Sequence, residues 1–264
     1  MIVRARPATV GTTLRALVGP ADWGRARIAA GAWLLVMLAL PFAEWIGGVP
    51  ARTAGVVLAV VLLAATVLLL LAHAAGAWAA LRIGAGIVGL AWVAEAVGAA
   101  TDLPFGPYAY TGLLQPQLAG VPVVIPLAWL MGLPPAWAVA ARIAGATRGP
   151  AFVLVAAGAM TAWDLFLDPQ MVAWGLWAWD IEGAYFGIPL QNFAGWLLVS
   201  ALITVVVRPA RLPLRPLVLL YSVTWLLEAG GLPLFWGLVG PGVVGAVVMG
   251  TFVLRAWRPV RPWT

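Results

Sequence analysis

Five carboxylic acids lie inside or at the ends of long apolar stretches of this chain, which has only nine acidic residues in all. They are Glu44, Glu95, Asp164, Asp168 and Glu228. A charged group at membrane depth is unfavourable unless it is paired or neutral, so an acid there is a functional hypothesis by default. Helix ends also carry charged residues as interface markers. We expect the five acids to contribute to one site, because markers alone would be scattered over both faces.

Asp164 and Asp168 have the spacing of two side chains on one face of a helix. Pro169 follows directly, and the residue before a proline is disfavoured in the helical conformation, so we expect the helix to end there. Two carboxyls one turn apart in apolar surroundings resist ionising together. One of them is expected to keep its proton near neutral pH, as a general acid must. The alternative is a helix end that is hydrogen-bonded to its own loop.

Hydroxyl, amide and aromatic groups lie close to these acids in the sequence. In the segment TDLPFGPYAYTG, residues 101–112, prolines and glycine fix a tight loop that presents the hydroxyls of Tyr108 and Tyr110. Asn192 either holds a water molecule or caps the start of a helix. Four tryptophans add aromatic faces: Trp163, Trp174, Trp177 and Trp179. Such residues either form an interfacial belt or stabilise a cation.

The elements that must position these groups are membrane-spanning helices. The chain is 64% hydrophobic and 9% charged, whereas about a quarter of the residues of a soluble domain are charged. Apolar stretches of about 20 residues are long enough to cross a bilayer as a helix. They occur at roughly 28–47, 54–74, 81–100, 121–141, 150–168, 189–207, 214–235 and 238–255. The sequence therefore predicts an all-α, polytopic membrane bundle of about eight helices.

The arginines orient this bundle. All 15 basic residues are arginines, and every one except Arg52 falls on the same side of the predicted spans. An excess of positive charge marks the cytoplasmic side, so both termini are expected in the cytoplasm, the protein in the cell membrane and the five acids in the outer layer. Two long outer segments, about 101–120 and 169–188, are expected to be ordered. We interpret residues 1–264 as one transmembrane domain.

Several classes of function are excluded or disfavoured. The chain has no cysteine, which excludes disulfides, thiol catalysis and cysteine-ligated metals. Its arginines are scattered between apolar spans and do not form a basic groove, so no nucleic-acid partner is expected. No histidine cluster or paired aspartate motif predicts a metal site, although magnesium held by carboxylates alone stays open. We expect no cofactor.

Four runs in the middle of the chain resemble one known family. PFGPYAYTG, GVPVVIPLAW, DLFLDPQMV and YFGIPLQNFAGW resemble the carotenoid hydratases of bacteria and archaea, which include γ-carotene 1′,2′-hydratases and bisanhydrobacterioruberin hydratases. The resemblance covers roughly residues 90–200. It implies addition of water to the terminal C=C bond of an acyclic (ψ) end group, on γ-carotene, a lycopene-like carotenoid or a C50 carotenoid in the lipid bilayer. The family pattern has glycine near Asp102, so the resemblance supports a role for Asp102 less than for the other acids. Glu228 lies outside the motifs and is a candidate by its position in the predicted topology alone.

Hydration of such an alkene begins with protonation of the less substituted carbon, and water then captures the tertiary cation. We expect Asp164 to donate the proton and Asp168 to keep it protonated, while Glu95 orients the water. Tyr108, Tyr110 and Asn192 would complete the hydrogen bonds of that water. Glu44 and Glu228 are further catalytic candidates by position, and Trp163, Trp179 and Tyr185 are candidate substrate contacts.

Two other functions fit part of this pattern. A proton-coupled transporter of small molecules also has acids along a cavity, but broken helices and internal repeats are typical of transporters, and neither is evident in the sequence. A carotenoid-binding membrane protein without catalytic activity would not need protonatable acids. Both remain alternatives to an enzyme at this point.

Overall fold

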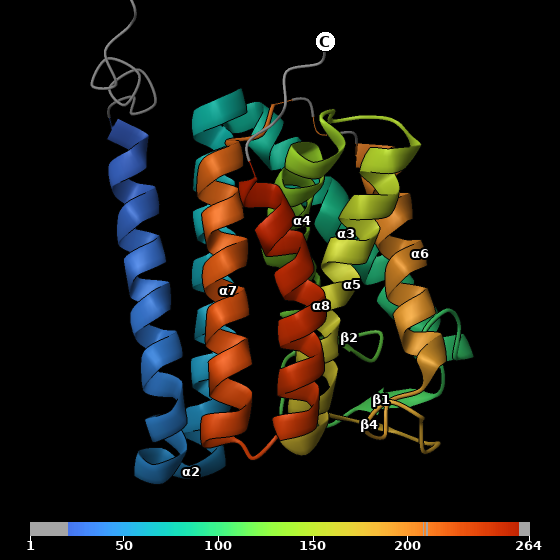
Figure 1. The fold of residues 1–264 in the computed structure, drawn as a ribbon. Helices are drawn as coiled ribbons and strands as arrows, with labels where there is room; N and C mark the ends of the chain where they lie inside the picture. The colour runs from blue at the N-terminus through green and yellow to red at the C-terminus, as the bar shows by residue number, and fades with distance from the viewer. Residues whose placement is uncertain (1–20, 208, 210, 259–264) are drawn as a thin grey trace, which may run out of the picture.

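The computed structural model describes residues 21–207, 209 and 211–258. Within them, seven helices are long and apolar enough to cross a membrane. They are α2 (Ala21–Ala75), α3 (Ala77–Thr101), α4 (Ile125–Ala144), α5 (Pro150–Ala173), α6 (Leu190–Val207), α7 (Leu214–Phe235) and α8 (Val239–Trp257). Their axes run side by side in one bundle (Figure 1). The expected all-α, multi-pass membrane architecture is confirmed.

Helix α2 consists of two helices that meet at Gly48. Gly48 has φ 66°, in the left-handed region that glycine adopts without a Cβ clash. The chain turns back there, so the two halves of α2 form a hairpin (Figure 1). Counting these halves separately gives the eight helical segments that hydropathy predicts for the described residues. The turn lies between Glu44 and Arg52.

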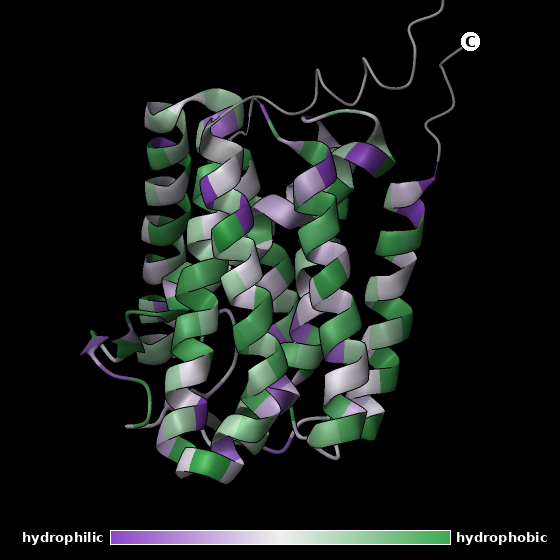
Figure 2. Ribbon diagram, turned by 90° about the vertical axis from the view of Figure 1, so that its left-hand side faces the viewer, coloured by the Kyte–Doolittle hydropathy of each residue, from purple (hydrophilic) through white to green (hydrophobic). Residues whose placement is uncertain are grey.

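Large apolar side chains cover the outside of the bundle. Leu35, Trp45 and Leu154 are among those that are more than two-thirds exposed. Hydrophobic residues extend along the helices in Figure 2. In water this surface would be unfavourable, whereas in a bilayer it contacts acyl chains, so the exterior agrees with a membrane-spanning bundle.

The two ends of the bundle differ. At the end where α2 begins and α8 finishes, Arg142 of α4 donates hydrogen bonds to the carbonyl oxygens of Ala256 and Arg258. Five of the arginines used to predict the orientation lie outside the described residues: Arg4, Arg6, Arg15, Arg208 and Arg261. Strands β1 and β4 lie at the opposite end (Figure 1), so the two ends resemble the arginine-rich and arginine-poor sides expected from the sequence.

The two long segments expected outside the spans pair with each other. Strand β1 (Tyr108–Tyr110) is antiparallel to β4 (Trp177–Trp179), and Tyr108 is opposite Trp179. A second small sheet joins β2 (Gln117–Leu118) to β3 (Val121–Pro122). The pairing brings together residues that are about seventy positions apart in the chain.

Helix α5 continues through Pro169 to Ala173, so the prediction that it ends at Asp168 is wrong. Proline has no N–H and leaves the carbonyl oxygen of the residue four positions earlier without its helical donor. That residue is Leu165, whose carbonyl oxygen accepts a hydrogen bond of 3.0 Å from the hydroxyl of Tyr185. The tyrosine replaces the missing donor, and Asp168 therefore lies within the helix.

Candidate active site

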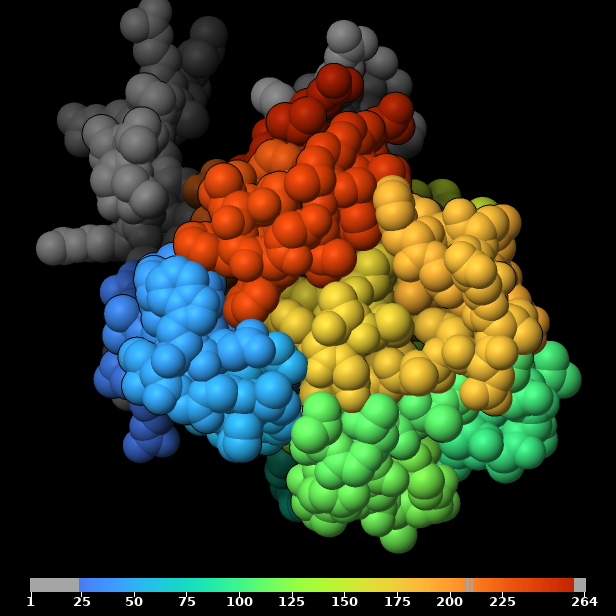
Figure 3. All heavy atoms as spheres, turned by 90° about the horizontal axis from the view of Figure 1, so that it is seen from below, coloured from blue at the N-terminus to red at the C-terminus, as the bar shows by residue number. Residues whose placement is uncertain are grey.

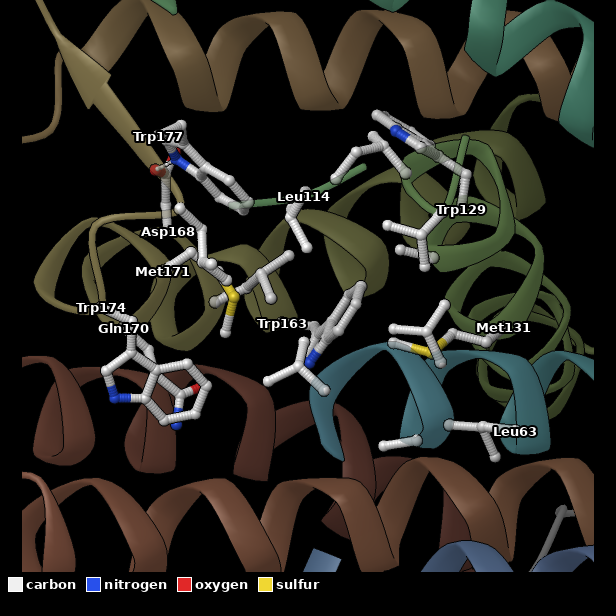
Figure 4. Close-up of a pocket in the computed structure, with 18 of the residues that line it drawn as sticks. Leu63, Leu114, Trp129, Met131, Trp163, Asp168, Gln170, Met171, Trp174 and Trp177 are labelled. Carbon is white, nitrogen blue, oxygen red and sulfur yellow. Dashed lines mark hydrogen bonds between the residues drawn. The ribbon is translucent and has the colours of Figure 1, made fainter. Parts of the chain in front are cut away.

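A cavity of about 120 Å³ lies near the strand-bearing end of the bundle. Both halves of α2 contribute to its wall, as do α3 to α7 and both strands of the β1–β4 pair. Most of the lining is apolar or aromatic (Figure 4). Seen from that end, the turn of α2, the two paired loops and the end of α7 lie side by side (Figure 3).

Asp164 and Asp168 lie together on α5, as their spacing predicts, and Asn192 of α6 links them. The side-chain nitrogen of Asn192 donates to Oδ2 of Asp164 at 2.7 Å and to Oδ2 of Asp168 at 2.5 Å. Asp168 also accepts N–H bonds on Oδ1 from Trp177 at 2.7 Å and Trp179 at 3.2 Å. Asp168 lines the cavity, whereas Asp164 is fully buried behind it and its Oδ1 has no partner within the described chain.

Glu95 of α3 is surrounded by donors. Its Oε2 accepts the hydroxyls of Tyr108 at 2.6 Å and Tyr110 at 2.8 Å, and its Oε1 accepts the indole N–H of Trp129 at 2.9 Å. Burial, followed by the negative charge of Glu95, raises the pKa of both tyrosines. Both hydroxyls therefore keep their protons and act as donors. Glu95 lines the same cavity as Asp168.

The pairing of β1 with β4 explains how the two groups of donors are placed. Alternate residues of a strand point to the same side, so Tyr108 and Tyr110 both reach Glu95 while Trp177 and Trp179 both reach Asp168. In the antiparallel register Tyr108 is opposite Trp179, and Tyr110 is opposite Trp177. Their rings are in contact, with centroids 5.3 and 5.8 Å apart. One short sheet thus supplies four donors to two acids.

Tryptophan faces form much of the remaining wall. Trp129 and Trp196 are stacked with ring centroids 4.3 Å apart, and Trp163 meets Trp196 edge-on at 6.2 Å. Trp163 lies between the labelled groups of the cavity in Figure 4. Its indole N–H is buried and has no partner within the described residues. Stacked indoles give the cavity both an apolar surface and π faces.

Glu44 does not line the cavity. It forms an ion pair of 2.7 Å with Arg52, the arginine that is alone on its side of the predicted spans. Arg52 is buried, donates a hydrogen bond of 2.9 Å to the carbonyl oxygen of Trp174 and lies 5.3 Å from the centre of that indole ring. The pair therefore ties the turn of α2 to the end of α5.

Glu228 of α7 lines the cavity, together with Thr224 one helical turn before it. It is 7% exposed, and no hydrogen bond or ion pair reaches its carboxyl from the described part of the chain. Gln170 of α5 is also buried, lines the cavity and has no side-chain partner among the described residues. This part of the wall therefore presents polar groups whose bonding capacity is unused.

The remaining residues singled out in the sequence differ in whether they line the cavity. Tyr185 is not part of the cavity wall and binds the Leu165 carbonyl oxygen instead. Trp163 and Trp179 both line the cavity. Asp102 is exposed at the end of α3 with φ 63°, a conformation that glycine adopts more readily at this helix position. No group of three His, Cys, Asp or Glu side chains in the described ranges is arranged to hold a metal ion.

Sequence reasoning missed the roles of two tryptophans and one glutamine. Trp129 ends the run GVPVVIPLAW, yet nothing in its local sequence indicates a bond to Glu95. For Trp177 the sequence predicts only an aromatic face, although the matching patterns Tyr-Ala-Tyr and Trp-Ala-Trp are a signal that two short strands pair. Gln170 had no signal beyond its proximity to Asp168.

Comparison with known proteins found one matching family model and one named relative. The family model described as carotenoid biosynthesis protein matches residues 55–252. A protein of Haloarcula japonica named bisanhydrobacterioruberin hydratase is 34% identical over 107 residues, which is 39% of this chain and 36% of that protein. The chain thus aligns with little more than a third of that relative's length. No solved structure matches.

Proposed function

The chain belongs to the carotenoid biosynthesis protein family, and we propose that it is a carotenoid hydratase. In this proposal it is a hydro-lyase that adds water to the terminal C=C bond of an acyclic (ψ) end group and needs no cofactor. The relative from Haloarcula japonica supports this proposal, because it is named as a hydratase. The substrate would be γ-carotene, a lycopene-like carotenoid or a C50 carotenoid taken from the lipid bilayer of the cell membrane.

The main support is that an apolar, tryptophan-lined cavity has bonded carboxyl groups in its wall. A hydrocarbon end group needs an apolar cavity, whereas its hydration needs a proton donor, a placed water molecule and a surface that tolerates a cation. Asp168 and Glu95 line the cavity together with the rings of Trp163 and Trp129. Aromatic faces and carboxylates both stabilise a nearby cation.

We assign the water side of the reaction to Asp168 and Glu95. Each accepts three hydrogen bonds from N–H or O–H groups. This is the environment of an ionised carboxylate, which can only accept. Such a group is suited to orient a water molecule and to take its proton as the oxygen bonds to the cation.

Asp164 has a different place in this proposal from the one expected from the sequence. It reaches Asp168 only through the amide of Asn192 and is not part of the cavity wall. We therefore treat Asp164 and Asn192 as positioning residues for Asp168. The proton donor must then be sought among the acids that line the cavity.

Pigment analysis tests the function. The chain would be produced in bacteria that accumulate lycopene or γ-carotene, and the carotenoids would be analysed by mass spectrometry. We expect a new carotenoid that is heavier by one water molecule and carries a tertiary alcohol. Protein purified with bound but chemically unchanged carotenoid would instead favour a binding protein. Absence of both binding and conversion would favour the transporter alternative.

A further inference from the structure

Glu228 differs from the other acids of the cavity in its surroundings. Glu95 and Asp168 have three donors each, whereas no donor from the described chain reaches Glu228. Its side chain is nevertheless buried and borders the same space as theirs. An isolated charge in such a place is strongly unfavourable, so burial favours the neutral carboxylic acid there.

The position of Glu228 is held by its helix. Tyr221 of α7 donates a hydrogen bond of 2.8 Å to the carbonyl oxygen of Ala159 on α5. Trp225 donates one of 2.9 Å to the carbonyl oxygen of Ala246 on α8. Residues four apart share a helix face, and both Thr224 and Glu228 line the cavity. The two anchors therefore keep that face of α7 directed at the cavity.

We propose that Glu228 is the proton donor of the hydration, acting from α7 while Asp168 and Glu95 act on the water. This inference rests on the proposed hydratase function. A neutral acid without a protein partner has an O–H that is free to point at the alkene. Asp168 and Glu95 accept hydrogen bonds on both oxygens, which favours the ionised form, and an ionised carboxyl has no proton to give.

The reaction balances with these groups. The proton of the Glu228 carboxyl forms the new C–H bond at the less substituted alkene carbon, and the π electrons leave a tertiary cation at its neighbour. The water oxygen bonds to that cation, and its proton goes to the carboxylate of Asp168. After the alcohol leaves, water in the cavity returns this proton from Asp168 to Glu228, so no external reductant or oxidant is needed.

The test compares Glu228→Gln with Glu182→Gln. Glu182 is an exposed glutamate outside the cavity and provides the same chemical change as a control. Removing a positioned acid typically lowers a rate by about 10²- to 10⁴-fold. We expect that loss for Glu228→Gln and wild-type conversion for Glu182→Gln. The glutamine variant should still copurify with unconverted carotenoid and keep its melting temperature in detergent, because a neutral amide of nearly the same size replaces the carboxyl group.

The outcomes separate the inference from the function. If Glu228→Gln hydrates as fast as the wild type while Asp168→Asn is inactive, the hydratase stands and Glu228 is not the donor. Loss of activity in Asp164→Asn alone would return that role to Asp164. If even the wild type makes no alcohol, the function and this inference fail together.

A second variant, Glu228→Asp, tests the proposal if Glu228→Gln does not fold. Should Glu228→Gln fail to accumulate in the membrane, Glu228→Asp retains an acid but withdraws it from the cavity by one methylene group. We then expect at least about a tenfold slower hydration with unchanged carotenoid binding, since proton donors must be within hydrogen-bond reach. Wild-type rates for Glu228→Asp would overturn the proposal.

Discussion

The acids on the two sides of the cavity differ in how many hydrogen-bond donors surround them. On the side built by α3 to α6 and the β1–β4 pair, Glu95 and Asp168 are enclosed by indole, phenol and amide donors. On the α7 side, Glu228 meets none from the described residues. Donors favour the charged form of a carboxyl group. In the mechanism proposed above, this difference in surroundings is what allows similar acids in one cavity to act as an anion and as a neutral acid.

The largest expected effect comes from the donor-rich side. Asp168→Asn removes a carboxylate that accepts three bonds and borders the cavity. We expect hydration to fall by about 10²- to 10⁴-fold, the usual contribution of a positioned base. The yield of carotenoid alcohol would be measured with Asp180→Asn as the control, because Asp180 is exposed. Equal activity of both variants would remove Asp168 from the mechanism.

A matched pair of tryptophans sharpens the comparison. Trp129→Phe removes an N–H bond to Glu95, whereas Trp137→Phe removes a bond of 2.7 Å to Thr204, away from the cavity. A hydrogen bond to a charged group contributes about 1.5–3 kcal/mol, so about a ten- to hundredfold slower hydration is expected for Trp129→Phe. Trp137→Phe should keep the wild-type rate. Similar rates for the two variants would mean that the donors of Glu95 do not affect catalysis.

The Arg52 contacts are expected to affect stability more than chemistry. Arg52→Gln breaks the ion pair with Glu44 and the bond to the Trp174 carbonyl oxygen. Loss of hydrogen bonds to a charged, buried group is expected to lower stability by about 1–3 kcal/mol. A lower melting temperature in detergent would be measured against Arg82→Gln, which changes an exposed arginine. An unchanged melting temperature would show that the α2 turn does not depend on this pair.

The smallest effect concerns pH. Burial raises the pKa of Tyr108 and Tyr110, while tyrosine in an unfolded chain ionises near about pH 10. The folded state therefore retains more protons above that value, and the contribution of these two tyrosines to stability should be constant below about pH 10 and fall as the pH rises further. Tyrosinate absorbance and melting temperature would be followed together. Ionisation of these tyrosines in the folded protein near neutral pH would contradict the donor assignment.

The spans and the layer of acids could be predicted because both depend on local sequence. Hydropathy located the helices, and the arginine bias brought Glu95, Asp164, Asp168 and Glu228 to one end. Glu44 lies at that end too, but the sequence could not reveal that Arg52 binds it outside the cavity. The sequence predicts that α5 ends at Asp168, but the helix continues to Ala173. The donor that replaces the N–H of Pro169 comes from Tyr185, in a later loop, and local sequence does not reveal it. Contacts of this kind depend on tertiary structure.

The three-residue strands β1 and β4 make the charge pattern of the cavity depend on their register. A slip by one residue turns every side chain of a strand to the other side. If β1 slipped, Ala109 would face Glu95 in place of both tyrosines, and if β4 slipped, Ala178 would face Asp168 in place of both tryptophans. Each of the two acids therefore gains or loses two of its three donors together, because both of these donors belong to one strand.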